Sequence, residues 1–243
     1  MKTFGLIGKN IEYSFSRNYF NQKFKTENID AVYKNFDLEV ISKFAELSFK
    51  NEEIQGLNVT IPYKESIIPY LDKIDPIAQE IGAVNTIKVN NNGKLTGYNT
   101  DFYGFTEALK PYLKKHHNKA LILGTGGASK AIAYALNKLE IDFTFVSRNK
   151  TENNFTYPEL TEAIIQEFTL LINCTPLGTF PKTDQFPPIP TQFLSKEHLV
   201  FDLIYNPSHT KLMKLALNQN AEVINGLKML EFQAERAWEI WNK

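Results

Sequence analysis

Cysteine is nearly absent from this sequence, and neither sign of charge is in excess. Cys174 is the single cysteine in 243 residues, which excludes a disulfide framework and a cysteine-based zinc site. The 27 Lys and Arg residues balance the 27 Asp and Glu residues. This balance gives no reason to expect nucleic acid or a strongly acidic partner.

Long apolar runs are also missing, and none approaches the length needed to span a membrane. The opening residues MKTFGLIGKN enter a predicted strand at once, unlike a signal peptide. We therefore expect a cytoplasmic protein without membrane or nucleic-acid partners. Because 43% of the residues are hydrophobic, the chain can build a core in one large domain or two small ones.

Strand and helix patterns alternate along the first hundred residues. Short apolar or alternating runs predict strands over 4–7, 31–36, 54–59, 84–89 and 94–98. Ser16 is the expected N-cap of a helix reaching residue 27, and residues 39–49 predict a second helix. A third helix is expected after Pro62, with Lys64 in its first turn, and Pro76 is expected to start a fourth. The Asn91-Asn92-Gly93 sequence predicts a hairpin turn.

The second half repeats the alternation after a helix predicted over 101–113, which we expect to connect two halves. The charged stretch 114–119 is the expected boundary, and its His116-His117 pair is expected to be solvated. Strands are predicted over 121–123, 143–146, 170–173, 199–203 and 222–224. Helices are predicted over 128–139, 211–218 and 227–241, with a proline-rich loop over 181–190.

A glycine-rich turn joins the strand at 121–123 to the helix that follows. Gly124 permits a tight turn, Gly126 lets a pyrophosphate approach the backbone, and amides at the helix start meet its negative charge. Ser129 replaces the third glycine of the usual fingerprint, and is small enough for close packing while adding a hydroxyl near the phosphates. The alternative is an ordinary tight turn between a strand and a helix.

Four residues of the first half have side chains suited to binding or proton transfer. The hydroxyls of Ser14 and Ser16 can bind a carboxylate, although a role as helix N-cap would by itself account for Ser16. A lysine near a helix start, such as Lys64, suits proton exchange, because the helix dipole favours the uncharged amine. Asp101 can pair with Lys64 as an acid/base couple, with Asn85 between them. The alternatives are a surface lysine and an N-cap aspartate.

Two further segments are placed to face a ligand in a doubly wound sheet. The loop from Asn173 to Gly178 begins at the carboxyl end of a strand, where ligands bind in such sheets. Cys174 within it is interpreted as a packed residue, because no histidine lies near it in sequence. Gly226, which opens the last helix, is interpreted as a glycine of close approach.

Taken in chain order, these segments resemble the shikimate dehydrogenase family over nearly the whole chain. The matching motifs are Ser14 with Ser16, Asn58 to Lys64, Gly82 to Thr86, Gly97 to Gly104, Gly124 to Ala131, Asn173 to Gly178, Asp202 to Thr210, and Asn225 to Gln233. Their order is far more specific than any one of them.

The resemblance implies an α/β fold of two domains. Residues 1–101 would form a substrate-binding domain, completed by the C-terminal helix 226–243, and residues 102–225 a Rossmann-type NADP-binding domain. The implied reaction is the reversible NADPH-dependent reduction of 3-dehydroshikimate to shikimate, in chorismate and aromatic amino acid biosynthesis. No metal is implied.

The resemblance also implies a role for each matching residue. Lys64 and Asp101 would be catalytic. The substrate would be held by Ser14, Ser16, Thr60, Asn85, Asp101, Tyr205 and Gln233. The cofactor would be bound by Gly124, Thr125, Gly126, Gly127, Ala128, Ser147, Arg148, Asn149, Leu203 and Gly226.

The chain departs from the family pattern after the second strand of the cofactor domain. Ser147-Arg148-Asn149-Lys150 leads within a few residues to Phe155, whereas a parallel crossover normally needs a dozen or more. We therefore expect a shortened crossover without its helix. Arg148 is still at the position where the 2′-phosphate of NADP would bind. The acidic residue that would favour NAD is missing there.

Two rival functions remain open at this point. One is a quinate/shikimate dehydrogenase with relaxed substrate or cofactor choice, and the other is a non-catalytic ligand sensor on the same fold. Intact Lys64 and Asp101 argue against the sensor. The expected partner is a small-molecule substrate, and the expected state is a monomer or homodimer.

Overall fold

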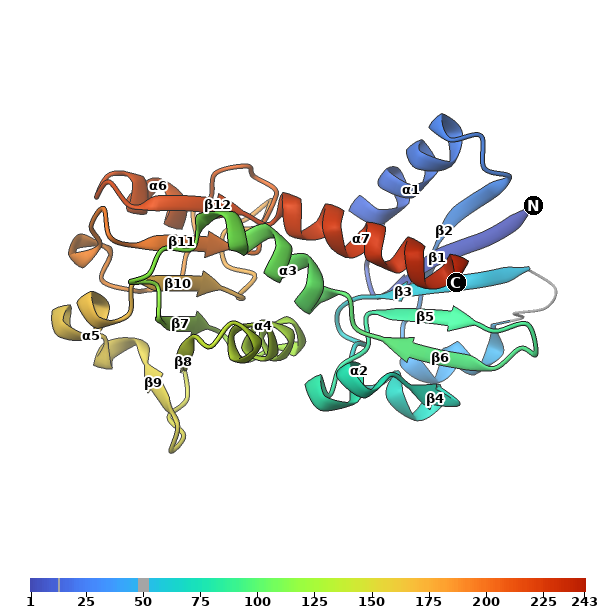
Figure 1. Cartoon of the computed structure of the whole chain (residues 1–243), viewed down its shortest axis with the longest axis horizontal. Coiled ribbons are helices and arrows are strands. Elements are labelled where there is room, and N and C mark those ends of the chain that lie inside the picture. The colour runs from blue at the N-terminus through green and yellow to red at the C-terminus, as the bar shows by residue number, and fades with distance from the viewer. Residues whose placement is uncertain (13, 48–52) are drawn as a thin grey trace. The chain divides into compact units, whose positions relative to one another are not determined.

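The computed structural model describes residues 1–12, 14–47 and 53–243. The chain divides into two compact units (Figure 1): unit 1 comprises Met1–Thr100 and Ala234–Lys243, and unit 2 comprises Asp101–Gln233. Each unit contains its own sheet. None of the helices in the described ranges is long and apolar enough to cross a membrane.

Unit 1 is built on a mixed sheet with the strand order β2-β1-β3-β5-β6-β4 among the described residues. Its strands are β1 (Lys2–Gly8), β2 (Ala31–Asp37), β3 (Ile54–Val59), β4 (Lys73–Ile74), β5 (Thr86–Val89) and β6 (Leu95–Tyr98). The first three are parallel, and β5 and β6 form the predicted antiparallel hairpin, in which Thr86 pairs with Tyr98. Gly93 has a φ of 79° in its turn, which suits glycine.

Helices cover both faces of this sheet. On one face, α1 (Phe15–Thr26) packs with the end of α7 (Leu227–Asn242) around Phe4, Phe20 and Trp241. The other face carries α2 (Pro76–Ile81), which Asp75 caps and Pro76 begins as predicted. Two helix predictions in unit 1 are wrong. Residues 39–49 contain only a short 3₁₀ segment, Ile41–Glu46, and residues 48–52 lie outside the described residues.

The second wrong prediction concerns the segment after Pro62. Residues 61–67 form consecutive turns that lead into the 3₁₀ segment Ile68–Tyr70, so Lys64 is not in an α-helix. The backbone is held from outside the segment, since the Val84 amide donates to the Lys64 carbonyl at 2.7 Å. Tyr63 and Ile67 of this segment lie in the core.

Unit 2 contains a fully parallel sheet with the order β12-β11-β10-β7-β8-β9 among the described residues. Its strands are β7 (Lys119–Leu123), β8 (Asp142–Ser147), β9 (Asn154–Thr156), β10 (Leu170–Asn173), β11 (Leu199–Asp202) and β12 (Glu222–Asn225). Counted from β7, this is the 3-2-1-4-5-6 order of a dinucleotide-binding Rossmann fold. The order reverses between β7 and β10, which defines the ligand-binding edge.

Apolar side chains fill both faces of the unit 2 sheet. One face packs against α3 (Asp101–Leu109), α4 (Gly127–Lys138) and Met229 of α7. The other packs against α5 (Glu162–Glu167) and α6 (Lys211–Leu217). The strands are apolar on both sides because helices cover both faces.

The link between β8 and β9 contains no helix. Residues 148–153 connect the two strands, and Phe145 pairs with Asn154 while Ser147 pairs with Thr156. β9 has only three residues and lies beside the last three of β8. From the end of β8 at Ser147, the chain has to run back only to the level of Phe145 to begin β9, a distance of roughly 7 Å along the strand. A short turn is sufficient for this.

Of the histidine pair at 116–117, only His117 departs from the expected solvation, because the His116 side chain is 38% exposed. His117 is 3% exposed, and its Nδ1 accepts a hydrogen bond from the Lys114 amide at 3.1 Å. Burial and the neighbouring His116 lower the pKa of His117. The pair lies within unit 2 and helps to close the turn before β7.

Candidate functional site

The glycine turn lies at the carboxyl end of β7, at the point where the strand order reverses. Gly124 has a φ of 98°, a conformation that favours glycine. A Cβ at Gly124 would lie 3.0 Å from Thr175 Cγ2, and one at Gly126 would meet nothing within 4 Å. Gly126 is the N-cap of α4 and supplies no side chain to it. This is open space at the positive end of a helix of 12 residues, which suits a phosphate.

Ser129 fits the packing prediction but not the prediction for its hydroxyl. The residue is 1% exposed, and its Oγ donates to the Gly126 carbonyl oxygen at 2.7 Å. The hydroxyl therefore stabilises the first turn of α4 from inside and does not point toward the phosphates.

A cavity of about 430 Å³ opens beside the glycine turn. It is lined by the turn itself, by β8 and by the residues after it: Thr125, Phe145, Ser147, Arg148, Asn149, Thr151, Asn153 and Asn154. Arg148 is the only cation in this lining. Burial raises the pKa of nearby Tyr157, and the Arg148 charge opposes that shift. The cavity thus places a guanidinium close to the turn that leads into α4, a combination that suits an adenosine phosphate.

The loop after β10 is held by its own polar side chains. Asn173 donates to Asp202 Oδ1 at 3.0 Å and accepts from the Thr175 amide at 3.0 Å. Burial raises the pKa of the Cys174 thiol far above its usual value, so the thiol is inert, as the sequence predicts. Burial also raises the pKa of Asp202 to about 6, against hydrogen bonds from Thr210, Ile204 and Asn173.

Gly226 lies in close contact with the backbone of Leu203, which leaves no room for a side chain at this position. A Cβ at Gly226 would clash with the carbonyl oxygen of Leu203. The Gly226 amide donates to the Ile204 carbonyl at 3.1 Å. Leu203 and Gly226 therefore lie against each other at the same edge of the sheet. Tyr205 follows on this loop, and burial raises its pKa.

Gln233 and Asp101 are the last and first residues of unit 2, and both are buried. Gln233 is 6% exposed, donates to the Leu230 carbonyl at 3.2 Å, and lies against Gly104 of α3. Asp101 is 5% exposed and is the first residue of α3. It follows directly on Thr100, which is anchored in unit 1.

In unit 1, Ser14 rather than Ser16 caps α1. Ser14 Oγ accepts from the Arg17 amide at 3.2 Å, while Ser16 lies within the first turn. The N-cap prediction for Ser16 is therefore wrong, because the helix begins one residue before it. Both serines are 8% exposed. Ser16 is hydrogen-bonded to Tyr33, whose pKa burial raises well above its usual value.

A buried polar network extends from Tyr33 toward Asn85. Tyr33 donates to Asn58 Oδ1 at 2.7 Å, and Asn58 donates to Thr86 Oγ1 at 3.1 Å. Asn85 is 2% exposed and is hydrogen-bonded to Thr100, accepting from its amide at 2.6 Å and donating to its hydroxyl at 3.0 Å. Asn85 therefore fixes the residue that precedes Asp101.

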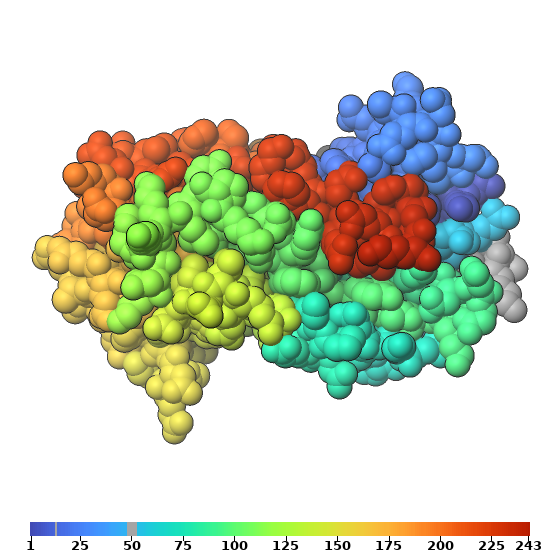
Figure 2. Space-filling view, in the orientation of Figure 1, coloured from blue at the N-terminus to red at the C-terminus, as the bar shows by residue number. Residues whose placement is uncertain are grey.

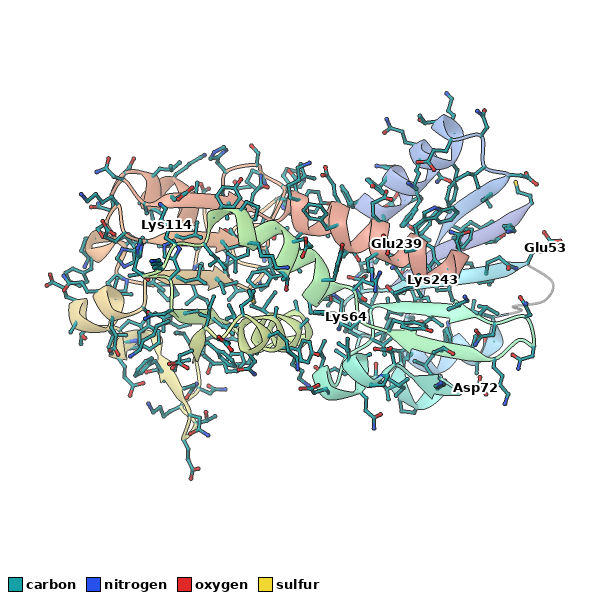
Figure 3. The ribbon with its side chains drawn as sticks, in the orientation of Figure 1. Glu53, Lys64, Asp72, Lys114, Glu239 and Lys243 are labelled. Atoms are coloured by element: carbon teal, nitrogen blue, oxygen red, sulfur yellow. The ribbon has the colours of Figure 1, made fainter. Side chains whose placement is uncertain are left out.

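Lys64 and Thr60 lie at the end of β3, close in sequence to this network. The Thr60 amide donates to the Ile7 carbonyl at 2.8 Å. Lys64 is half-buried, and its carbonyl accepts from Val84, the residue before Asn85. Figure 3 labels Lys64 in the turn after β3. Unit 1 thus gathers Ser14, Ser16, Thr60, Lys64 and Asn85 at one end of its sheet.

Two residues of the polar network and the cavity gave no motif signal in the sequence. Tyr33 is recognisable only as a buried position of an alternating strand, and Asn154 only as the polar first residue of a short aromatic strand. A second cavity, of about 690 Å³, lies in unit 1 beside Lys2, Gln55 and Asn91 and contains none of the predicted site residues. The described residues contain no cluster of His, Cys, Asp and Glu suited to a metal ion.

Comparisons with known proteins decide the family. Residues 6–87 match the family model of the shikimate dehydrogenase substrate binding domain. The shikimate dehydrogenase (NADP(+)) of Clostridium botulinum is 42% identical over 252 aligned positions, covering 99% of this chain and 96% of that protein. The chain belongs to the shikimate dehydrogenase family. The alignment is longer than the chain, so the Clostridium botulinum protein has residues without a counterpart here.

Solved structures of the family have the same fold. The shikimate dehydrogenase of Aquifex aeolicus matches with a TM-score of 0.90 at 35% identity, covering 100% of this chain and 92% of that one. The shikimate 5-dehydrogenase of Thermus thermophilus, in complex with NADP(H) and shikimate, matches with a TM-score of 0.83 at 30% identity, covering 99% and 93%. The predicted α/β class and the family resemblance are therefore confirmed.

Proposed function

We propose that this protein catalyses the reversible reduction of 3-dehydroshikimate to shikimate with NADPH. The observation that carries this proposal is the match over 99% of the chain to a relative named shikimate dehydrogenase (NADP(+)). The unit 2 cavity supports it, because open space at Gly126 and the guanidinium of Arg148 suit a phosphorylated dinucleotide.

The domain roles follow the two units. Unit 1 would hold the substrate and unit 2 the cofactor. Helix α7 belongs to both, because Gln233 lies in unit 2 and the residues from Ala234 onward lie in unit 1. The residues proposed to bind the cofactor are Gly124, Thr125, Gly126, Gly127, Ala128, Ser147, Arg148, Asn149, Leu203 and Gly226. A monomeric or homodimeric state and a cytoplasmic location remain predictions from the sequence.

The proposed chemistry uses Lys64 as the acid and base. The cofactor, when bound, supplies a hydride to the ketone carbon of the substrate. Negative charge then develops on the ketone oxygen, and Lys64 Nζ donates a proton to that oxygen, giving the hydroxyl of shikimate. Asp101 is proposed to exchange the proton with Lys64, and in the reverse direction Lys64 accepts the hydroxyl proton.

The remaining proposed substrate residues orient the molecule. Ser14 and Ser16 have hydroxyls suited to its carboxylate, while Thr60, Asn85, Tyr205 and Gln233 offer donors and acceptors for its ring hydroxyls. The burial of Asn85 and its hydrogen bonds to Thr100 support a fixed geometry at this position.

A spectrophotometric assay at 340 nm tests the proposal. The purified protein is expected to reduce NADP when shikimate is added, with a higher kcat/KM for NADP than for NAD. Turnover of quinate equal to that of shikimate would favour the relaxed dehydrogenase, and binding of shikimate without turnover would favour the sensor.

A further inference from the structure

The turn that carries Arg148 is exposed, yet it ends on a buried polar residue. Residues 148–153 are all exposed, whereas Asn154 is 7% exposed. Figure 2 shows the yellow segment around this turn as a projection from the surface of unit 2. A turn with so little packing needs polar contacts to keep one conformation.

Asn154 supplies those contacts from beneath the turn. Its Nδ2 donates to Ser147 Oγ at 2.6 Å and to the Asn149 carbonyl at 2.8 Å. Its Oδ1 accepts from the Thr151 amide at 2.7 Å and the Thr151 hydroxyl at 3.0 Å. The amide orientation is fixed by chemistry, because a carbonyl can only accept and a backbone N–H can only donate.

The contacts of Asn154 surround Arg148 on both sides in the chain. Ser147 and Asn149 are its direct neighbours, and Ser147 Oγ also donates to the Asn149 carbonyl at 2.6 Å. The Ser147 hydroxyl, the Asn149 carbonyl and the Asn154 amide thus form a closed triangle. This triangle sets the backbone from which the Arg148 side chain starts.

The other cation of the turn is directed elsewhere. Lys150 Nζ donates to the Asn154 carbonyl at 2.9 Å and to the two Glu159 oxygens at 2.9 and 3.0 Å. Glu159 is in turn held by the amide and hydroxyl of Thr156. Lys150 is not part of the cavity lining, so Arg148 has no second cation beside it there.

We propose that Asn154 is a positioning residue for cofactor choice, which fixes the turn so that Arg148 can bind the 2′-phosphate of NADP. This proposal rests on the proposed function. A bidentate guanidinium–phosphate contact depends on orientation, and no crossover helix supports this turn. The side chain of Asn154 therefore supplies the contacts that hold the two sides of the turn together.

The test replaces Asn154 and compares the two cofactors. Asn154→Ala removes every side-chain contact, and Asn154→Thr keeps a strand-forming residue that is too short for both sides of the turn. We expect kcat/KM for NADP to fall about tenfold in each, through KM, with kcat/KM for NAD changed less than twofold. Asn118→Ala, an exposed loop asparagine of the same unit, is the matched control and is expected to change neither.

A double-mutant cycle separates positioning from general stability. In the Arg148→Ala background, Asn154→Ala is expected to leave the NADP:NAD ratio unchanged, because the residue acts through Arg148. Equal loss with both cofactors, an additive effect in the cycle, or failure of both Asn154 variants to fold would each overturn the proposal.

A binding measurement distinguishes failure of this inference from failure of the proposed function. Calorimetry with adenosine 2′,5′-bisphosphate and with 5′-AMP needs no turnover. Wild-type protein that binds the bisphosphate more tightly but does not oxidise shikimate refutes the function alone. An Asn154→Ala variant that keeps the wild-type preference for the bisphosphate refutes the inference alone.

Discussion

Lys64 is the residue on which the proposed proton transfer depends. Lys64→Ala is expected to lower kcat by roughly 10²–10⁴ and to change shikimate binding little, because the acid acts mainly in the transition state. Steady-state kinetics and equilibrium binding of shikimate measure the two effects. Lys94→Ala, at the exposed hairpin of the same unit, is the control, and near wild-type turnover in Lys64→Ala would remove the assignment.

Ser14 has two roles that mutations can separate. The Ser14 hydroxyl is expected to bind the substrate carboxylate and also caps α1. Ser14→Ala should raise KM for shikimate and cost about 1 kcal/mol of stability, whereas Ser14→Gly should raise KM with a loss of only a few tenths. Ser16→Ala is expected to raise KM as well. A main effect on kcat with unchanged KM would show that the hydroxyls do not hold the ground state.

Arg148 is predicted to carry most of the preference for NADP. Loss of its charge-assisted contact should weaken NADP by about 1.5–3 kcal/mol, or roughly ten- to a hundredfold, and leave NAD nearly unchanged. The ratio of kcat/KM for the two cofactors measures this. Lys150→Ala is expected to keep the ratio, because Lys150 binds Glu159. The opposite ranking of the two variants would place the phosphate on Lys150.

Sequence patterns predict residue chemistry better than residue contacts. The glycines at 124 and 226 were predicted for tight geometry, and the structure gives both that geometry. The hydroxyl of Ser129 and the capping role of Ser16 were assigned wrongly, because a one-residue shift or a local carbonyl redirects a short side chain. Contacts such as those of Asn154 depend on a turn conformation that no motif encodes.

At the scale of elements, most predicted strands and helices are present in the structure, and the differences lie in segments that tertiary contacts shape. Strand β9 of unit 2 was not among the predicted strands. It has three residues, which pair with the edge of β8. The helix predicted over 39–49 is a 3₁₀ segment within its described part. In both cases tertiary packing around few residues decides the structure, and local propensity is a weak guide.

The end of α7 is an element whose removal should destabilise unit 1. Trp241 packs against Phe4 and Phe20, with ring centroids 4.9 and 5.3 Å apart, and donates to the Ile87 carbonyl at 2.9 Å. Trp241→Ala should therefore cost about 3–5 kcal/mol of unfolding free energy. Trp241→Phe keeps the ring contact and should cost less. Urea unfolding measures both, and a loss below about 1 kcal/mol in the alanine variant would contradict the packing role.

At the scale of the whole molecule, the order of motifs predicts the family and the fold together. Motif order fixes which strands precede the glycine turn and the Asn173 loop, and those strands meet where the sheet order reverses. The electrostatic consequence of this packing is not visible in the sequence. Asp202 becomes fully buried at the end of β11, among three hydrogen-bond donors.

Asp202 should make the stability of the molecule depend on pH. Burial raises its pKa in the folded state from 3.8 to about 6, so between these values the folded state binds more protons than the unfolded state. Its contribution is therefore fully present below about pH 4 and is lost as the pH rises through about 6.

Asp202→Asn isolates this effect, because the amide keeps an acceptor for Asn173 and Ile204 and cannot ionise. Unfolding free energies of the wild type and the variant, measured from pH 4 to pH 7.5, give their difference at each pH, in which groups common to both proteins cancel. We expect the wild type to lose on the order of 2–3 kcal/mol relative to the variant across this range. A difference that stays constant would mean that folding does not shift the pKa of Asp202. A difference that moves in favour of the wild type as the pH rises would mean that the folded protein stabilises the carboxylate, and either result would contradict the burial penalty.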